Sequence, residues 1–408
     1  MANYPNHQRI TRAAISVQPV WIRSLLGTQA KRLGDHYCLY GDLVVSGKPS
    51  ERKVMERFMT MPDGKRAVMG PASLDERENC RVWNKEFSFW YAAISAAIRR
   101  KRMADAAQYL GVIAHALGDT TALAHPLSHS EGLRMELIKR LFPTNKKYRY
   151  MSLHNLLENL PTSFSIRGHR PVLLGASAEE AAFFTAQEMV RLTTRTLAKL
   201  PNAIKKLYAD DIPAVQRIAG DAYADSARIY ADIMYTAFSM ACGKAGRGSL
   251  PKTVCLDPLV PSSMSGWSPH PYFFKPLYDA PCNFDRRMEP FPLMLQAGAR
   301  KKEYAHGFGM GVTSYIEYSL PAGVFRRFSC IIGLNAGLAE RTAVSVAVTD
   351  GKRSLFKKTF RSVRDIEVLD IDLAGVRSLR FETTGAGKYE KFGTVDGHVV
   401  VADPVLMR

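Results

Sequence analysis

The stretch QYLGVIAHALGDTTALAHP, residues 108–126, decides how the first half of this 408-residue chain is predicted to fold. Apolar residues occupy nearly every side of its first part, which indicates a buried helix. Two ionisable side chains, His115 and Asp119, interrupt that surface four residues apart. Residues at this spacing share one face of a helix, so the two could bind one ion. Buried ionisable groups are costly unless they are paired or bind a metal.

Three more side chains of the same chemical type follow along the chain. His125 comes six residues after Asp119, and the segment SLHNLLENLP (152–161) contains His154 and Glu158, again four apart. Imidazole nitrogens and carboxylate oxygens suit zinc. A buried His–Asp hydrogen bond and an unrelated downstream pair would explain these residues two at a time. The five together, in this order, favour a metal site.

The ordered set His115, Asp119, His125, His154 and Glu158 resembles the core of the zinc-dependent phospholipase C and single-strand nuclease superfamily. The text YLGVIAHALGD followed by AHP is similar to the same part of that family. The resemblance covers roughly residues 20–240 and implies an all-helical domain that binds one to three zinc ions. It implies that His125, His154 and Glu158 hold one ion. His115 and Asp119 would contribute to the other two, with Asp119 as the bridge.

The upstream ligands that the resemblance implies are a tryptophan, two histidines and an aspartate. Trp21 would take the tryptophan's place only if the chain were cleaved before it, because that residue binds through a free amine. His36 is the only histidine between His7 and His115, so at least one expected histidine is missing. Asp42 or Asp35 would supply the aspartate, and Asp42 lies at about the right distance upstream.

The resemblance implies zinc-assisted hydrolysis of a phosphodiester. Asp119 would fix the metal spacing, and Asp42 is the candidate general base. Arg167, His169 and Arg170 are candidates for binding the substrate phosphate, since arginine forks match phosphate oxygens. An ordinary solvated loop would explain those three residues as well. The net charge of +18 favours an anionic partner, which could be a phospholipid, a nucleic acid or a polyanionic glycan.

Two other functions stay open. A single-strand nuclease or nucleotidase would need aromatic side chains that stack on bases, which Trp83, Trp90 and Tyr91 could supply. Packing in a helical core explains these three aromatics equally well. A catalytically degenerate domain would instead be a binding or scaffold protein.

The chain is predicted to have several domains. Residues 1–20 read as a polar leader that could be disordered, and residues 21–242 as an all-α helical bundle. Residues 243–278, rich in Gly, Pro and Ser, read as a linker. Residues 279–408 alternate apolar and polar positions over many short strands, which predicts an all-β sandwich.

The last region also resembles a known family. HGFGMGVTSYIEYSLP (306–321) and the closing GHVVVADPVLM (397–407) look like the NPCBM module, a carbohydrate-binding jelly roll. The resemblance implies a glycan partner, while a stabilising or protein-binding sandwich is the alternative.

Location and redox state are only weakly indicated. Family members are usually exported, but residues 1–20 lack the apolar region of a cleavable signal. No run of about 18 apolar residues predicts a membrane span. The six cysteines are scattered; they could pair, Cys242 with Cys255 for example, or be free buried thiols. The oligomeric state is not indicated.

Overall fold

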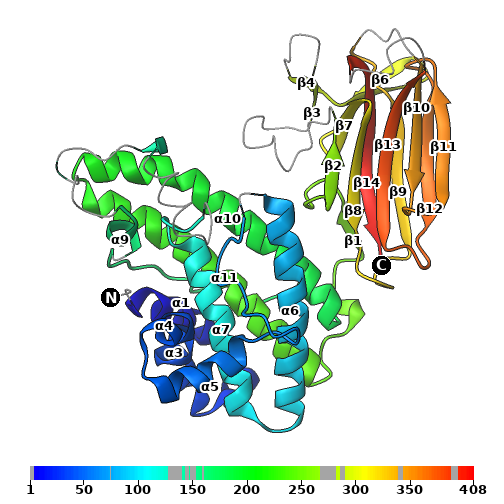
Figure 1. The fold of residues 1–408 in the computed structure, drawn as a ribbon. Coiled ribbons are helices and arrows are strands. Elements are labelled where there is room, and N and C mark those ends of the chain that lie inside the picture. The colour runs from blue at the N-terminus through cyan, green and yellow to red at the C-terminus, as the bar shows by residue number, and fades with distance from the viewer. Residues whose placement is uncertain are drawn as a thin grey trace. The chain divides into compact units, whose positions relative to one another are not determined.

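The computed structural model describes residues 4–73, 75–126, 140–142, 147, 153–158, 160–266, 282–284, 290–338, 343–386 and 394–408. The chain divides into two compact units, residues 1–250 and 251–408. The first is helical and the second is built from strands (Figure 1). The predicted order of a helical domain followed by a β-sandwich is confirmed.

The helices of the first unit are α1 (Tyr4–Ser16), α2 (Val20–Leu26), α3 (Gln29–Asp35), α4 (Tyr40–Ser46), α5 (Pro49–Met59), α6 (Glu76–Arg99), α7 (Met103–Thr121), α9 (Leu153–Glu158), α10 (Ala178–Tyr208) and α11 (Ile212–Ala241). Short 3-10 turns are η1 (Tyr37–Leu39) and η3 (Arg247–Ser249). Helix α7 packs against α1, α3, α4, α6, α10 and α11. Its apolar surface is therefore covered on all sides, as its sequence predicts, and residues 110–121 are all buried.

The N-terminal segment differs from the prediction. Residues 1–20 were expected to form a polar leader that could be disordered, but residues 4–16 form helix α1. Ile10 and Ala14 are fully buried, and α1 packs against α3, α7 and α11. The polar residues dominate the composition of this segment, while the helical spacing of its few apolar residues determines its fold.

The strands of the second unit are β1 (Thr253–Cys255), β2 (Ser263–Ser265), β3 (Cys282–Phe284), β4 (Pro290–Pro292), β5 (Met294–Ala297), β6 (Arg300–Glu303), β7 (Gly307–Val312), β8 (Ser314–Ser319), β9 (Arg327–Leu334), β10 (Ala343–Thr349), β11 (Ser354–Phe360), β12 (Ile366–Asp372), β13 (Ser378–Ala386) and β14 (Thr394–Met407). One sheet has the order β1-β14-β9-β12, with β7 also paired to β14, and the other has the order β11-β10-β13-β8-β2. The pairings are antiparallel.

Alternating side chains fill the space between these two sheets. Strand β10 buries Val344, Val346 and Val348 completely and leaves the residues between them partly exposed. This period of two is the pattern of a strand with one face on a core. Aromatic residues complete the core; the ring centroids of Phe308 and Phe381 lie 5.3 Å apart.

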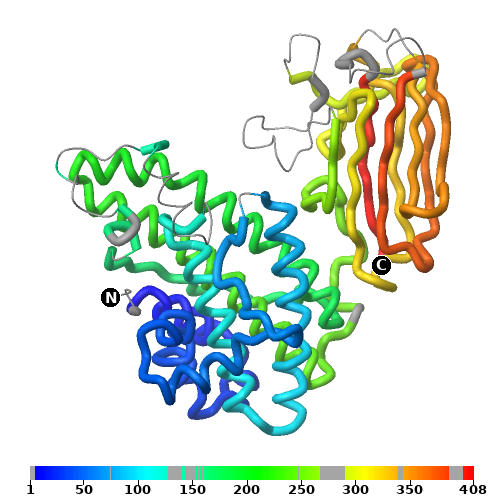
Figure 2. The backbone as a smooth tube through the Cα atoms, viewed as in Figure 1, coloured from blue at the N-terminus to red at the C-terminus, as the bar shows by residue number. Residues whose placement is uncertain are grey.

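The predicted linker, 243–278, is wrong in part. Strand β1 pairs with β14 and strand β2 pairs with β8, so residues 253–265 belong to the sandwich (Figure 2). Residues 267–278 lie outside the described part of the chain. Within the described residues 253–265, the Gly, Pro and Ser content marks the turn between two short strands.

Two smaller expectations can be compared with the described residues. Cys242 and Cys255 are both free thiols, so the suggested pair is not formed. Among the described helices, none has both the length and the apolarity needed to cross a bilayer.

Candidate metal centre

Helix α7 carries the first two candidate ligands on one buried face. The His115 and Asp119 side chains are both almost fully buried, and His115 Nε2 lies 3.3 Å from Asp119 Oδ2. Gly111, one turn earlier, allows the chain at Tyr37 to approach closely, since a Cβ at position 111 would lie 2.5 Å from the Tyr37 carbonyl oxygen. That approach brings η1 and the start of α4 against α7.

The first cluster of donor atoms consists of His7 from α1, Asp42 from α4 and His115 from α7. One donor atom from each lies within 4.8 Å of the others. The two imidazole rings stack with centroids 4.4 Å apart and planes 16° apart. Two glycines make the space for these rings. A Cβ at Gly41 would lie 2.1 Å from His115 Nε2, and one at Gly118 would lie 2.1 Å from His7 Nδ1.

The second cluster consists of Asp119, His125 and Glu158, again with donor atoms within 4.8 Å of one another. His125 follows the end of α7, and Glu158 ends the short helix α9. His125 Nε2 lies 3.5 Å from Glu158 Oε1. Two distant segments of the chain therefore converge here.

Asp119 connects the two clusters. Its Oδ1 lies 3.4 Å from His7 Nε2, while its Oδ2 contacts His115. The same carboxylate belongs to the donor set of His125 and Glu158. Both oxygens contact histidines of the first cluster, and the carboxylate also lies within 4.8 Å of the donor atoms of the second. A carboxylate placed between two donor sets in this way can bridge two cations.

The charges in the cluster favour a cation. Burial lowers the pKa of His115, but the charge and contact of Asp119 outweigh burial and raise it to about 9. Burial alone would raise the pKa of Asp119, but the adjacent histidines, His115 above all, hold it far below its usual range. Burial and the charge of His115 lower the pKa of His7. The carboxylate of Asp119 thus favours positive charge beside it, either a proton on His115 or a bound cation.

Two buried atoms of the first cluster have no hydrogen-bond partner among the described residues: His7 Nδ1 and Asp42 Oδ2. Buried polar atoms are rarely left unpaired, and each one in a native structure needs an explanation. His115 Nδ1 is 3.3 Å from the Cys38 carbonyl oxygen, a contact that leaves Nε2 to face the cluster. A carbonyl partner on the outer nitrogen is the usual support of a metal-binding histidine. The residues therefore fit a metal such as zinc.

Five of the seven predicted metal ligands are brought together: Asp42, His115, Asp119, His125 and Glu158. His154 lies on α9, four residues before Glu158, but its side chain is outside the described ones. His36 belongs to neither cluster; it is exposed, and its ring lies near those of Tyr37 and Tyr40.

His7 is the donor that the sequence interpretation missed. It lies on α1, within the residues interpreted as a leader, and it supplies a histidine where the upstream pattern lacked one. The spacing of Ile10, Ala14 and Val17 is helical and could have placed His7 on a folded element.

Trp21 lies outside both clusters. It lies in α2, where its ring contacts Phe238 edge-on and Lys244 lies over it.

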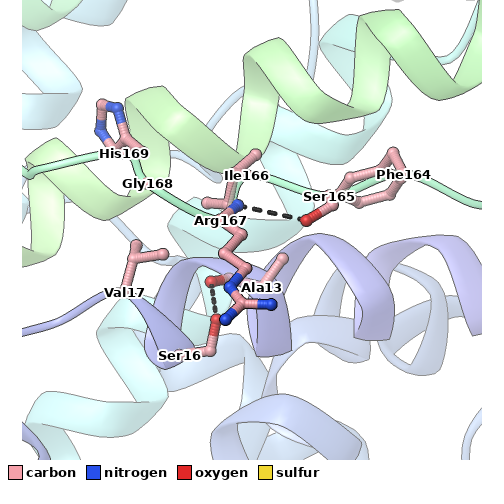
Figure 3. Close-up of a pocket in the computed structure, with 9 residues that line it drawn as sticks. All are labelled: Ala13, Ser16, Val17, Phe164, Ser165, Ile166, Arg167, Gly168 and His169. Carbon is pink, nitrogen blue, oxygen red and sulfur yellow. Dashed lines mark hydrogen bonds between the residues drawn. The ribbon is translucent and has the colours of Figure 1, made fainter.

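The predicted phosphate-binding residues lie elsewhere. Arg167 and His169 line a pocket of about 560 Å³ with Ala13 and Ser16 of α1 and with Val17, which follows that helix (Figure 3). Ala13 is six residues beyond His7, which places the pocket roughly 9 Å along the helix from the cluster.

The three side chains differ in their surroundings. In Figure 3 the Arg167 side chain extends over α1 toward Ser16. His169 Nε2 is 2.9 Å from Asp232 Oδ1, so that ring is already held by a carboxylate. Arg167 and Arg170 are exposed.

The comparisons with known proteins concern the second unit. Residues 279–401 match the NPCBM/NEW2 domain family. A solved structure, CBM51 from Clostridium perfringens GH95 in complex with methyl-galactose, is 20% identical with a TM-score of 0.30, and covers 38% of this chain and 99% of that one. The M60 catalytic domain with CBM51-1 and CBM51-2 from Clostridium perfringens ZmpB is 18% identical with a TM-score of 0.31, over 38% of this chain and 15% of that one. No curated protein matches this chain. The sandwich unit is thus an NPCBM-type module.

Proposed function

We propose that the helical unit is a zinc-dependent phosphodiester hydrolase of the phospholipase C type. The observation that supports this most is the position of Asp119, whose carboxylate contacts His7 and His115 of the first cluster and belongs to the donor set of the second. The unpaired buried atoms of His7 and Asp42 support it further. Zinc in such a site would bind and neutralise phosphate oxygens and lower the pKa of a water molecule.

The residues of the two clusters would have different roles in this reaction. Asp119 would fix the distance between the ions by offering one oxygen to each side. His7, His115, His125 and Glu158 would hold the ions, with His154 as a further ligand from α9. Asp42 would accept a proton from the attacking water through Oδ2, which has no hydrogen-bond partner in the described part of the chain. The Cys38 carbonyl would keep His115 in the required tautomer.

A phospholipid headgroup is the substrate class that we favour over single-stranded nucleic acid. Single-strand binding normally uses aromatic rings that stack on bases. Trp83, Trp90 and Tyr91, the candidates for that role, are at most 1% exposed and pack in the core around α6. The net charge of +18 is compatible with either anion.

Metal analysis of the purified full chain tests the proposal. We expect bound zinc in the wild type and markedly less in His115→Ala and His154→Ala. His36→Ala is the matched control, because it removes an imidazole outside both clusters and should leave the zinc content unchanged. Equal zinc in wild type and His115→Ala would exclude this site.

Turnover separates the remaining functions. The zinc-loaded protein should release the phosphorylated headgroup from phosphatidylcholine vesicles, and His115→Ala should not. Release of nucleotides from single-stranded DNA instead would favour the nuclease. Full zinc loading with no turnover on either substrate would favour a scaffold.

We also propose that the sandwich unit binds a glycan, since it matches the NPCBM/NEW2 family. A panel of galactose- and GlcNAc-terminated glycans should bind the full chain and residues 251–408, but not residues 1–250. Glycan binding by residues 1–250 and not by residues 251–408 would contradict a glycan site in the sandwich unit.

A further inference from the structure

A second group of metal-type side chains lies in the sandwich unit, far along the sequence from the helical clusters. Cys255 is the last residue of β1, Asp257 follows two positions later, and His306 directly precedes β7. One donor atom from each lies within 4.8 Å of the others. His306 Nδ1 is 3.5 Å from Asp257 Oδ2.

Strand β14 holds the three residues together through its backbone. Cys255 pairs with Val405, and the Leu256 amide donates to the Pro404 carbonyl oxygen at 2.8 Å. On the other side, the Asp403 amide donates to the His306 carbonyl oxygen at 3.1 Å. Asp403 has a φ of 46°, at the point where the register of β14 shifts. The irregular turn of β14 therefore fixes both flanks of the group.

Asp257 is the buried member of this group, and only one of its two carboxylate oxygens has a hydrogen-bond partner among the described residues. The residue is 7% exposed, and its Oδ1 has no hydrogen-bond partner among the described residues. Its other oxygen contacts His306, whose side chain is 61% exposed. An Asp–His ion pair alone would leave Oδ1 buried and unpaired, and buried polar atoms without a partner are rare in native structures.

We propose that Cys255, Asp257 and His306 bind a zinc ion. Sulfur, nitrogen and oxygen donors together suit zinc, whereas calcium and magnesium take oxygen ligands. Donor atoms around a tetrahedral zinc lie roughly 3.5 Å apart, so small side-chain adjustments would close the present spacing. Binding releases the thiol proton of Cys255 to solvent. The exposed side of His306 leaves a fourth position for water or a ligand.

The site would fasten the first strand of the module. Strand β1 has only three residues and is an edge of its sheet, beside β14. A cation shared by Cys255 and His306 would tie β1 to the start of β7. This role is independent of the hydrolase proposed above.

Cobalt binding to the full chain tests the proposal, because a thiolate ligand gives Co²⁺ a near-ultraviolet charge-transfer band. The helical clusters contain no cysteine and cannot produce it. We expect the band in the wild type, its loss in Cys255→Ser, and at least about tenfold weaker Co²⁺ binding in His306→Ala. His115→Ala should keep the band, so that a failure of the helical site is distinguished from a failure of this one.

Cys242→Ser is the matched control, since Cys242 is an exposed free thiol on the helical unit. It should leave the band unchanged. Absence of the band in the wild type would overturn the site. Loss of the band in Cys242→Ser would also overturn the site. So would a band that persists in both Cys255→Ser and His306→Ala.

Discussion

The ring of His7 fits beside Asp119 because position 118 has no side chain. A Cβ there would lie 2.1 Å from His7 Nδ1 and 2.5 Å from its Cε1. Alanine in place of a helical glycine normally stabilises a helix by about 1 kcal/mol. At position 118 this gain in helix stability is opposed by a steric clash between the new Cβ and the His7 ring. The ring can avoid the clash only by rotating away from the metal cluster.

Gly118→Ala should therefore reduce zinc affinity at least about tenfold while the protein stays folded. Zinc titration followed by calorimetry, with circular dichroism as the check on folding, measures both quantities. Gly246→Ala is the control, since a Cβ at that position would meet nothing within 4 Å. Zinc affinity equal to that of the wild type in Gly118→Ala would mean that His7 is not a ligand.

Glu86 gives a pH-dependent contribution to stability that is separate from the metal centre. Burial raises its pKa to about 7, although the Val68 amide donates to Oε1 at 2.6 Å; Oε2 has no partner among the described residues. The folded state thus holds the Glu86 proton more tightly than the unfolded state does. The stability that this proton provides is complete below the ordinary pKa of glutamate, about 4.3. It is lost as the pH rises toward 7.

Glu86→Gln should consequently be more stable than the wild type at pH 8, by up to roughly 3 kcal/mol. The advantage should shrink toward pH 4, where Glu86 is protonated in both states. Urea unfolding of the two proteins at pH 4.5, 6 and 8 measures the difference. A difference that does not vary with pH would show that Glu86 titrates normally.

The candidate ligands show which part of a metal site can be predicted from the spacing of residues in the sequence. His115 with Asp119 and His154 with Glu158 are four apart on helices, so each pair is visible locally. His7 is more than a hundred residues from His115, and their pairing depends on how α1 packs on α7. Tertiary packing of that kind leaves no periodic signal.

At the scale of the element, α1 is connected to the second cluster by one buried side chain. Asn6 Nδ2 donates to the carbonyl oxygens of Glu158 at 3.3 Å and Leu160 at 3.2 Å, while Thr162 Oγ1 donates to Asn6 Oδ1 at 2.9 Å. The backbone around Glu158 is therefore positioned by the helix that also carries His7.

Asn6→Ala should destabilise the protein by roughly 1–3 kcal/mol, because buried carbonyl groups lose their donor. It should also weaken zinc binding, since Glu158 and His7 lose their common support. Asn84→Ala, at an exposed position of α6, is the matched control and should change neither quantity. Lower stability with unchanged zinc affinity would separate α1 from the metal centre.

Local sequence signals predict helices well where caps agree with periodicity. The apolar stripe over residues 212–241 predicts one helix, and it coincides with α11, where Asp211 Oδ1 accepts from the Ala214 amide. The apolar stripe over residues 178–199 likewise predicts a helix, and Pro201 predicts its end, but the helix continues to Tyr208 as α10. Beyond the proline, α10 buries Ala203, Ile204 and Leu207 in the core, and this packing outweighs the penalty of about 3 kcal/mol for an internal proline.

At the scale of the whole molecule, composition marked the change from helix to strand but misplaced the boundary. The chain divides at 250, whereas the sandwich was expected from 279. Strands of three residues, such as β1 and β2, are too short for alternation to be visible among glycine, proline and serine. Their contribution lies in long-range pairing with β14 and β8, which no local pattern records.

The boundary can be tested by comparing residues 251–408 with residues 279–408. The shorter piece lacks β1 and β2 and the buried side chains of Leu256, Leu259 and Val260. Burial of each such side chain contributes about 1.5–3 kcal/mol, so we expect the shorter piece to be several kcal/mol less stable. It should also associate through the newly exposed edges of β14 and β8. Urea unfolding and sedimentation measure the two effects.

Leu256→Ala within residues 251–408 separates the side-chain contribution from that of the strands. It truncates a fully buried side chain but keeps the pairing of β1 with β14. The substitution should lower stability by about 2–5 kcal/mol without causing association. If residues 279–408 unfold at the same urea concentration as residues 251–408, then β1 and β2 lie on the sandwich without stabilising it. The module would in that case begin where the composition first suggested.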